Sequence, residues 1–287
     1  MGIASKELSK QNILLKDIID LSDADIKNTK IRLISNHENI NVIDLFLNNP
    51  EEINTNWLFW NYSRAEFKED QIVIGLCRMD NGGDFYLLTT IKRVTKDLNI
   101  RNGIAYEGVE LAEYKKYYGR VVVKYHNTVQ NMVRWADNLI EEIEVSEILS
   151  SLYEGKNFPG YDKVCLKYNE LRTIIENNKT DWVNALSNQK AVYLITDLFT
   201  GKLYVGSATS DKGMLLDRWK NYVSNGHGGN KELKEIVEMQ GFEYVKQNFQ
   251  YTIIENYNAK IEDKVILERE SYWKEALDSR IHGMNCN

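Results

Sequence analysis

Two short runs of β-branched and aromatic residues around a glycine turn constrain the C-terminal part of this chain most strongly. Residues 192–206 read V-Y-L-I-T-D-L-F-T-G-K-L-Y-V-G, with the turn near Gly201. Alternating apolar residues on both sides of a glycine-containing turn are typical of a β-hairpin. In such a hairpin Tyr193 and Tyr204 lie near each other, and Gly206 lets a ligand approach the backbone closely. The sequence therefore predicts a small sheet with two tyrosines at one end.

Further polar residues follow the hairpin, each in a distinctive local context. Arg218 stands in D-R-W, His227 in N-G-H-G-G-N, Glu270 in L-E-R-E-S-Y-W-K, and Asn285 in H-G-M-N. Tyr222 follows the arginine by four residues. Taken one at a time these residues are ordinary, because a strand tyrosine usually packs in a core and a helical glutamate usually faces solvent. Their order along the chain carries more information than any single residue.

With these residues in this order, the stretch from Ala191 to Asn287 resembles the GIY-YIG nucleases, especially homing endonucleases encoded in phage introns. A-V-Y, ending at Tyr193, stands where the first family signature stands, and Y-V-G at 204–206 matches the second. Ala191 replaces the usual glycine at a backbone position, where we expect it to matter little. The resemblance implies an α+β domain with a small, mostly antiparallel three-stranded sheet and helices. It also implies hydrolysis of DNA phosphodiester bonds with Mg²⁺ or Mn²⁺.

The same resemblance implies a catalytic set and a role for each member. The set comprises Tyr193, Tyr204, Arg218, Tyr222, His227, Glu270 and Asn285. Glu270 is implied as the metal ligand, since carboxylate oxygen is the hard ligand that these cations prefer, and Glu268 is left as a surface acid. Arg218 stabilises phosphoryl charge, and Tyr204 orients the attacking water or the phosphate. Tyr193 or Tyr222 takes the proton of the water, with His227 as a competing base, phosphate donor or loop-positioning residue. Asn285 holds the shape of the site by hydrogen bonds.

The charge of the chain limits how it can bind DNA. The net charge is −6 and most of the acidic excess precedes residue 186, so neither half carries a broad basic field. Double-stranded DNA must therefore be held by local clusters. The candidates are Lys212, Lys220, Lys231 and Lys234. The alternative is that these lysines only solvate helix faces. A homodimer, or two successive nicks, would be needed to cut both strands.

The first part of the chain predicts a separate α+β domain with a curved sheet or small barrel. Runs rich in β-branched residues follow one another at 71–78, 85–94, 108–111, 120–125 and 143–145. We expect residues 1–167 to form a target-recognition or regulatory domain, 168–189 a helical connector, and 190–287 the nuclease-like domain. The strand pattern of the first domain is loosely similar to PUA-like barrels, several of which read modified bases.

Trp57 and Trp60 lie in an aromatic-rich segment, W-L-F-W-N-Y, and allow two interpretations. They line a pocket that stacks a flipped or unpaired base and so contact DNA, or they pack in a core or a domain interface.

The remaining composition excludes several classes of protein. The three cysteines are widely separated and form neither a zinc pattern nor a disulfide framework. No apolar run is long enough to cross a bilayer, and the N-terminus lacks the apolar core of a signal peptide, so we expect a cytoplasmic protein without membrane partners.

Three functional hypotheses remain open. The first is a metal-dependent endonuclease in restriction or anti-phage defence, whose first domain chooses the target. The second is a homing or mobile-element endonuclease. The third is a catalytically silent DNA- or protein-binding module that keeps the nuclease fold as a scaffold.

Overall fold

The computed structural model describes residues 12–37, 40–62, 65–79, 83–209 and 213–285. The chain forms two compact units, residues 1–153 and 154–287. This division falls earlier than the boundary expected near residue 167. The reason is packing, because the helices predicted as a connector place Tyr168, Leu171 and Trp182 in the core of the second unit.

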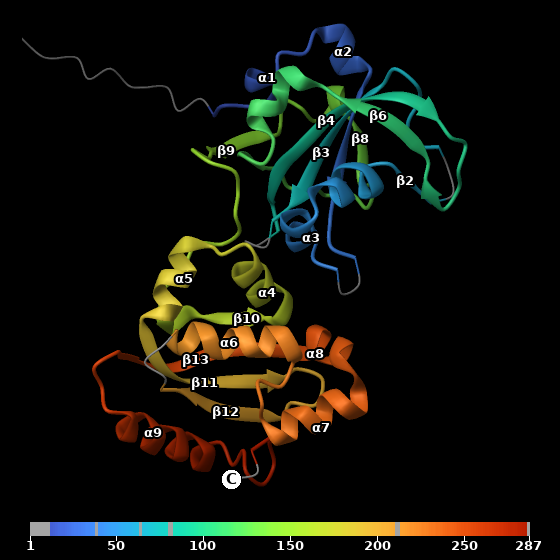
Figure 1. Cartoon of the computed structure of the whole chain (residues 1–287). Coiled ribbons are helices and arrows are strands. Elements are labelled where there is room, and N and C mark those ends of the chain that lie inside the picture. The colour runs from blue at the N-terminus through green and yellow to red at the C-terminus, as the bar shows by residue number, and fades with distance from the viewer. Residues whose placement is uncertain (1–11, 38–39, 63–64, 80–82, 210–212, 286–287) are drawn as a thin grey trace, which may run out of the picture. The chain divides into compact units, whose positions relative to one another are not determined.

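The first unit is built on a seven-stranded sheet in the order β8-β1-β3-β4-β7-β9, with β6 paired to β4. Figure 1 shows this unit, with β3 and β4 labelled. The β1–β3 pair is parallel and the other pairs of this sheet are antiparallel. Its strands are β1 (Thr29–Ile34), β3 (Ile72–Arg78), β4 (Phe85–Asp97), β6 (Tyr106–Glu110), β7 (Val121–Lys124), β8 (Val133–Trp135) and β9 (Glu144–Ile148). Within the described ranges the strand order has two ends, so the sheet is open. Of the two predicted forms, a curved sheet or a small barrel, the closed barrel does not form in these ranges.

Short helices and a two-stranded ribbon complete the first unit. The ribbon pairs β2 (Trp60–Asn61) with β5 (Gly103–Ile104). The helices are α1 (Leu15–Ile18), α2 (Asp23–Lys27), α3 (Val42–Asn48), the π-helix η1 (Glu52–Trp57) and the 3₁₀ turns η2 (Ala112–Tyr117) and η3 (Ala136–Asn138). The central strand β3 is buried on both faces, which explains its continuous apolar run I-V-I-G-L-C. Ile72 and Ile74 belong to one core cluster, and Val73 and Cys77 to another.

The second unit contains a four-stranded antiparallel sheet in the order β10-β13-β11-β12. The strands are β10 (Cys165–Lys167), β11 (Gln189–Asp197), β12 (Leu203–Ala208) and β13 (Phe249–Asn258). The helices are α4 (Tyr168–Glu176), α5 (Thr180–Ser187), α6 (Met214–Asn225), α7 (Lys231–Gln240), α8 (Phe242–Asn248) and α9 (Asp263–Ala276), with the 3₁₀ turn η4 (Tyr161–Lys163). The predicted α+β class and the predicted hairpin, β11–β12, are confirmed. The sheet has one strand more than the three expected, because β10 is only three residues long and has no period to detect.

Alternation along β11 separates the two faces of this sheet. Tyr193 and Ile195 point into the core that contains Trp219 of α6. Val192 belongs to a smaller cluster that contains Ile266 of α9. Helices α6 and α9 therefore cover opposite faces of the sheet. Strand β12 is an edge strand of this sheet. In neither unit is a described helix long and apolar enough to cross a membrane.

Candidate active site

A cluster of two buried tyrosines and a half-buried arginine lies on the α6 face of the second unit. The Tyr193 and Tyr222 hydroxyl oxygens are 2.8 Å apart, and Arg218 Nε donates to the Tyr193 oxygen at 2.9 Å. The Arg218 guanidinium also lies over the Tyr222 ring, 5.1 Å from its centre. Arg218 and Tyr222 face the same way because they are four residues apart on α6. Both tyrosine side chains are fully buried.

Burial decides the charge state of these two hydroxyls. Removal from water raises the pKa of both Tyr193 and Tyr222, because the phenolate would lose its hydration. Both residues are therefore neutral at physiological pH, and their hydroxyls act as hydrogen-bond partners of Arg218 and of each other. This environment does not favour the expected role of either tyrosine as the base that deprotonates water.

The loop after α6 ties His227 to the same arginine. Gly226 ends the helix in the left-handed conformation, with φ of 80°. Arg218 Nη1 then donates to the Gly228 carbonyl oxygen at 2.8 Å. Within the loop, His227 Nδ1 accepts the Gly229 backbone N–H at 3.0 Å. A neutral imidazole whose Nδ1 accepts carries its proton on Nε2. The half-buried His227 therefore presents Nε2 as a donor. The bond from Gly229 fits the expected loop-positioning role, and the Nε2–H fits the phosphate donor rather than a base.

Gly206 makes room for the Tyr193 hydroxyl. The two residues are opposite each other in the β11–β12 ladder. A Cβ at Gly206 would lie 2.5 Å from the Tyr193 hydroxyl oxygen. The glycine is needed here because the tyrosine side chain passes directly over its Cα. Tyr204, two residues earlier on β12, lies diagonally from Tyr193 on the same face and is 5% exposed.

Glu270 lies on the opposite face, on α9. One carboxylate oxygen accepts the Ser207 hydroxyl of β12, and the other lies 2.7 Å from the Lys274 ammonium. The Glu270 side chain is 15% exposed. Glu268, two residues earlier on the helix, is 65% exposed and pairs with Lys264 at 3.9 Å. The structure therefore distinguishes the two acids of the E-R-E block, since only Glu270 contacts the edge strand.

The Glu270 carboxylate fits a magnesium or manganese site of a particular kind. Among the residues that the structure describes, no group of three or more His, Cys, Asp or Glu could hold a metal together. A site of one carboxylate is compatible with Mg²⁺, which usually keeps several waters and binds one or two carboxylates together with substrate phosphate. Lys274 would have to leave the carboxylate when such an ion binds, because both would compete for the same charge.

The two halves of the site meet at β12. Gly206 faces the tyrosine cluster, and its neighbour Ser207 bonds to Glu270 on the other face. Since β12 is the edge strand, groups from both faces can reach a ligand at this edge without crossing the sheet.

Asn285 fastens the C-terminal segment to the same edge strand. Its amide accepts the Val205 N–H and donates to the Val205 carbonyl, both at 2.8 Å. Ser279 Oγ donates to the same amide oxygen at 2.8 Å. Asn285 is 4% exposed. This geometry fits the expected shape-holding role, because the amide replaces a neighbouring strand at this point.

The residues predicted to contact DNA do not form one cluster in the part of the chain that the structure describes. Lys220 and Lys234 pair on their own helices with Asp217 and Glu238, at 3.5 and 3.9 Å. Lys231 is exposed at the start of α7. Lys212 lies outside the described residues. Trp57 and Trp60 belong to the first unit and line a cavity there.

Two residues that the sequence argument missed contact the candidate metal ligand. Ser207 directly follows the Y-V-G signature, and Lys274 follows Glu270 by one helical turn. The spacing i, i+4 on a predicted helix is a detectable signal for the lysine. No comparable signal exists for the serine, whose role depends on how α9 packs.

Comparison with known proteins gave no matching family model and no matching curated protein. Among solved structures, a mutant form of the catalytic domain of intron endonuclease I-TevI is 26% identical, with a TM-score of 0.28, over 34% of this chain and 94% of that chain. The catalytic domain of homing endonuclease I-TevI is 27% identical, also with a TM-score of 0.28, over 34% of this chain and 98% of that chain.

Proposed function

We propose that the second unit is a metal-dependent DNA endonuclease that hydrolyses phosphodiester bonds at the edge of β12. One observation carries this proposal: a sheltered carboxylate, Glu270, and a preassembled arginine, Arg218, flank two adjacent residues of the edge strand. Hydrolysis of a phosphodiester benefits from both side chains, because a cation held by the carboxylate and the guanidinium neutralise different oxygens of the phosphate.

Arg218 would bind the phosphoryl oxygens. Its Nε and Nη1 are already committed to Tyr193 and Gly228, which fixes the plane of the guanidinium. Its remaining N–H groups then donate to the phosphate without reorganisation. Such fixed donors are worth about 10²–10³ in rate when they are aimed at developing charge. His227 would add a second donor through Nε2, from the loop that Arg218 holds.

Tyr204 would orient the attacking water. It lies on the same face as the buried pair, and no hydrogen bond to its hydroxyl is found within the described ranges. The Tyr193 and Tyr222 hydroxyls, by contrast, serve to hold Arg218. The water oxygen forms the new bond to phosphorus and releases its proton to the surrounding solvent. The bond to the 3′ oxygen breaks and that oxygen takes a proton from solvent, which leaves a 5′-phosphate and a 3′-hydroxyl.

Glu270 would hold Mg²⁺ or Mn²⁺ through a carboxylate oxygen, with Ser207 orienting the carboxylate from β12. A bound cation of this kind polarises the scissile phosphate and stabilises the leaving oxygen.

The biological role that we propose is restriction or defence against foreign DNA, with the first unit choosing the target. The support is that the chain contains a second compact unit, residues 1–153, in addition to the nuclease-like one. Phage DNAs that differ in base modification provide the test. A cleavage pattern that is the same on all of them, at no defined site, would contradict this role.

The catalytic proposal is tested by cleavage of plasmid and phage DNA in Mg²⁺ and in Mn²⁺. Glu270→Ala is compared with Glu268→Ala, a matched control on the same helix whose side chain is exposed. We expect wild type and Glu268→Ala to cut and Glu270→Ala to leave the DNA intact. Equal cleavage by Glu270→Ala would place catalysis elsewhere. Absence of cleavage by the wild type on every substrate would favour a binding module.

A further inference from the structure

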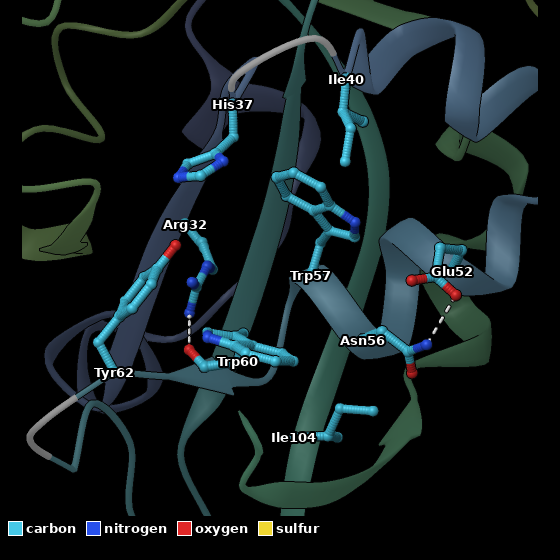
Figure 2. A pocket seen from close by; sticks show the side chains of 9 residues that line it. All are labelled: Arg32, His37, Ile40, Glu52, Asn56, Trp57, Trp60, Tyr62 and Ile104. Atoms are coloured by element: carbon cyan, nitrogen blue, oxygen red, sulfur yellow. Dashed lines mark hydrogen bonds between the residues drawn. The ribbon is translucent and has the colours of Figure 1, made fainter. Parts of the chain in front are cut away.

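A cavity of about 310 Å³ opens in the first unit, beside the π-helix η1 and the β2–β5 ribbon (Figure 2). Its volume lies at the lower end of the ~300–1,000 Å³ typical of small-molecule sites. The π-helix ends at Trp57, and single π-turns occur frequently at functional sites. The cavity lies within one unit, so its shape does not depend on how the two units are arranged.

Aromatic rings form much of the wall. Trp57 and Trp60 are half-buried and line the cavity, whereas Tyr62 is 62% exposed at its rim. The Trp60 and Tyr62 rings meet edge to face, 6.5 Å apart. Trp57 both lines the cavity and packs against the core of the unit. Rings that are anchored on one side and open on the other are suited to stack a planar ligand.

The polar groups of the cavity present acceptors on one side. Glu52 and Asn56 are four residues apart on η1, and Asn56 Nδ2 donates to Glu52 Oε2 at 2.7 Å. This bond leaves Oε1 of Glu52 and Oδ1 of Asn56 without a donor among the residues that the structure describes. Both oxygens are therefore free to accept N–H groups of a ligand.

The half-buried Arg32 supplies a charged donor on the other side of the cavity. Its Nη1 donates to the Trp60 carbonyl oxygen at 2.8 Å (Figure 2) and to the Leu58 carbonyl oxygen at 3.3 Å. Burial lowers the pKa of Arg32 to about 10, so the group is still charged at neutral pH. Its charge disfavours a cationic ligand such as a methylated ammonium, which an aromatic cavity with a carboxylate would otherwise accept.

We infer that this cavity binds a nucleobase with an exocyclic amino group, extruded from DNA. The base stacks on Trp60 and Trp57, its amino group donates to Glu52 and Asn56, and its ring acceptors face Arg32. Thymine fits less well, because it offers one N–H between two carbonyls and has no amino group. The DNA source of the base rests on the proposed nuclease function. The binding of a base in the cavity does not depend on that function.

The test measures binding without cleavage, by tryptophan fluorescence of the full chain in EDTA. The probes are the four deoxynucleoside 5′-monophosphates, and single-stranded and duplex oligonucleotides that carry 2-aminopurine. Trp60→Ala should weaken oligonucleotide binding about ten-fold or more, as expected for the loss of a stacking platform. Glu52→Gln should remove the preference for amino-bearing bases over thymine. Trp135→Phe controls for the loss of one tryptophan fluorophore, since Trp135 lies on β8 of the same unit, against Lys30 and outside the cavity.

The outcomes separate the possible ligands. Weaker oligonucleotide binding in Trp60→Ala and altered base preference in Glu52→Gln, with Trp135→Phe unchanged, would support the inference. Free monophosphates bound as tightly as oligonucleotides would identify a free nucleotide as the ligand and contradict the DNA source. Equal binding by all variants, or saturation by a trimethyl-lysine peptide and by no nucleotide, would overturn it. Because no metal is present, these results are independent of whether the second unit cuts DNA.

Discussion

The two sides of β12 are built in opposite ways. On the α6 side, the half-buried Arg218 bonds to Tyr193, which bonds in turn to Tyr222, and both tyrosines lie in the core. On the α9 side, Glu270 makes an ion pair with Lys274 at the margin of the fold. Five residues of α6 are buried, but only Ile266 is buried on α9. The first side is preorganised by packing, whereas the second combines a smaller apolar cluster around Ile266 with the ion pair between Glu270 and Lys274.

This difference suggests a division of labour. The arginine must be fixed before substrate arrives, because a fixed donor costs no reorganisation in the transition state. The Glu270 carboxylate, by contrast, must release Lys274 before it can bind a metal ion. Substitutions on the α6 side should therefore change the rate of cleavage, and those on the α9 side should change the metal requirement or the attachment of the helix.

The largest effect is expected on the packed side, for Arg218→Lys. A lysine keeps the positive charge but cannot bond to Tyr193 and Gly228 and still face a phosphate with a planar fork. We expect the single-turnover cleavage rate to fall by about 10²–10³. Arg280→Lys is the control, because Arg280 is exposed and bonds only to the Ser271 hydroxyl among the described residues. Similar rates for both variants would mean that the buried network does not position the arginine for chemistry.

Gly206→Ala should disturb the same side without touching a charge. The added methyl group would lie 2.5 Å from the Tyr193 hydroxyl, so the ring must move and Arg218 with it. We expect a cost of about 1–3 kcal/mol in the free energy of unfolding, as for an overpacked core, and at least a ten-fold loss of cleavage. Tyr193→Phe removes the hydroxyl and leaves the ring in place, so it should cost less in both measurements. The reverse order would show that the hydroxyl bonds matter more than the position of the ring.

A smaller effect is expected on the charged side, for Lys274→Met. This change removes the competitor for the Glu270 carboxylate and keeps a side chain of similar length. A helical ion pair of this kind is worth about 0.3–1 kcal/mol, so the Mg²⁺ concentration for half-maximal cleavage should fall about two- to five-fold. Lys264→Met, which frees the exposed Glu268, should leave this concentration unchanged. An unchanged requirement in Lys274→Met would show that the lysine does not compete with the metal.

The same contrast explains what the sequence could and could not predict. The hairpin was predictable because alternation and a glycine turn are local signals, and they correctly place Tyr193 and Tyr204 on one face. The contact between Ser207 and Glu270 was not predictable, since it depends on how α9 packs and joins residues that are 63 positions apart in the sequence. The burial of Tyr193 and Tyr222 was equally hidden, and it decides whether these hydroxyls can be bases. Strand β10 was not predicted, because three residues are too few to show a periodic pattern.

The attachment of α9 also depends on pH, through a second ion pair on this helix. Arg269, next to Glu270, makes an ion pair with Glu255 of β13, and the Trp273 indole N–H donates to the same carboxylate at 3.0 Å. The bond to Arg269, with smaller contributions from Tyr257 and Trp273, lowers the pKa of Glu255 to about 2. A lowered folded-state pKa gives stability that is fully present above the unfolded pKa of about 4.3 and is lost as the pH falls towards 2.

Glu255→Gln should therefore destabilise the second unit by about 1–2 kcal/mol at pH 7, a value reduced for solvent screening of the pair. The difference from wild type should shrink below about pH 4 and vanish near pH 2. Urea unfolding followed by circular dichroism at pH 7, 4 and 3 measures it, and only the transition of the second unit should move. If the difference in unfolding free energy is the same at every pH, α9 is attached to the sheet by apolar packing, as α6 is. The two sides of β12 would then differ only in the charge of Glu270.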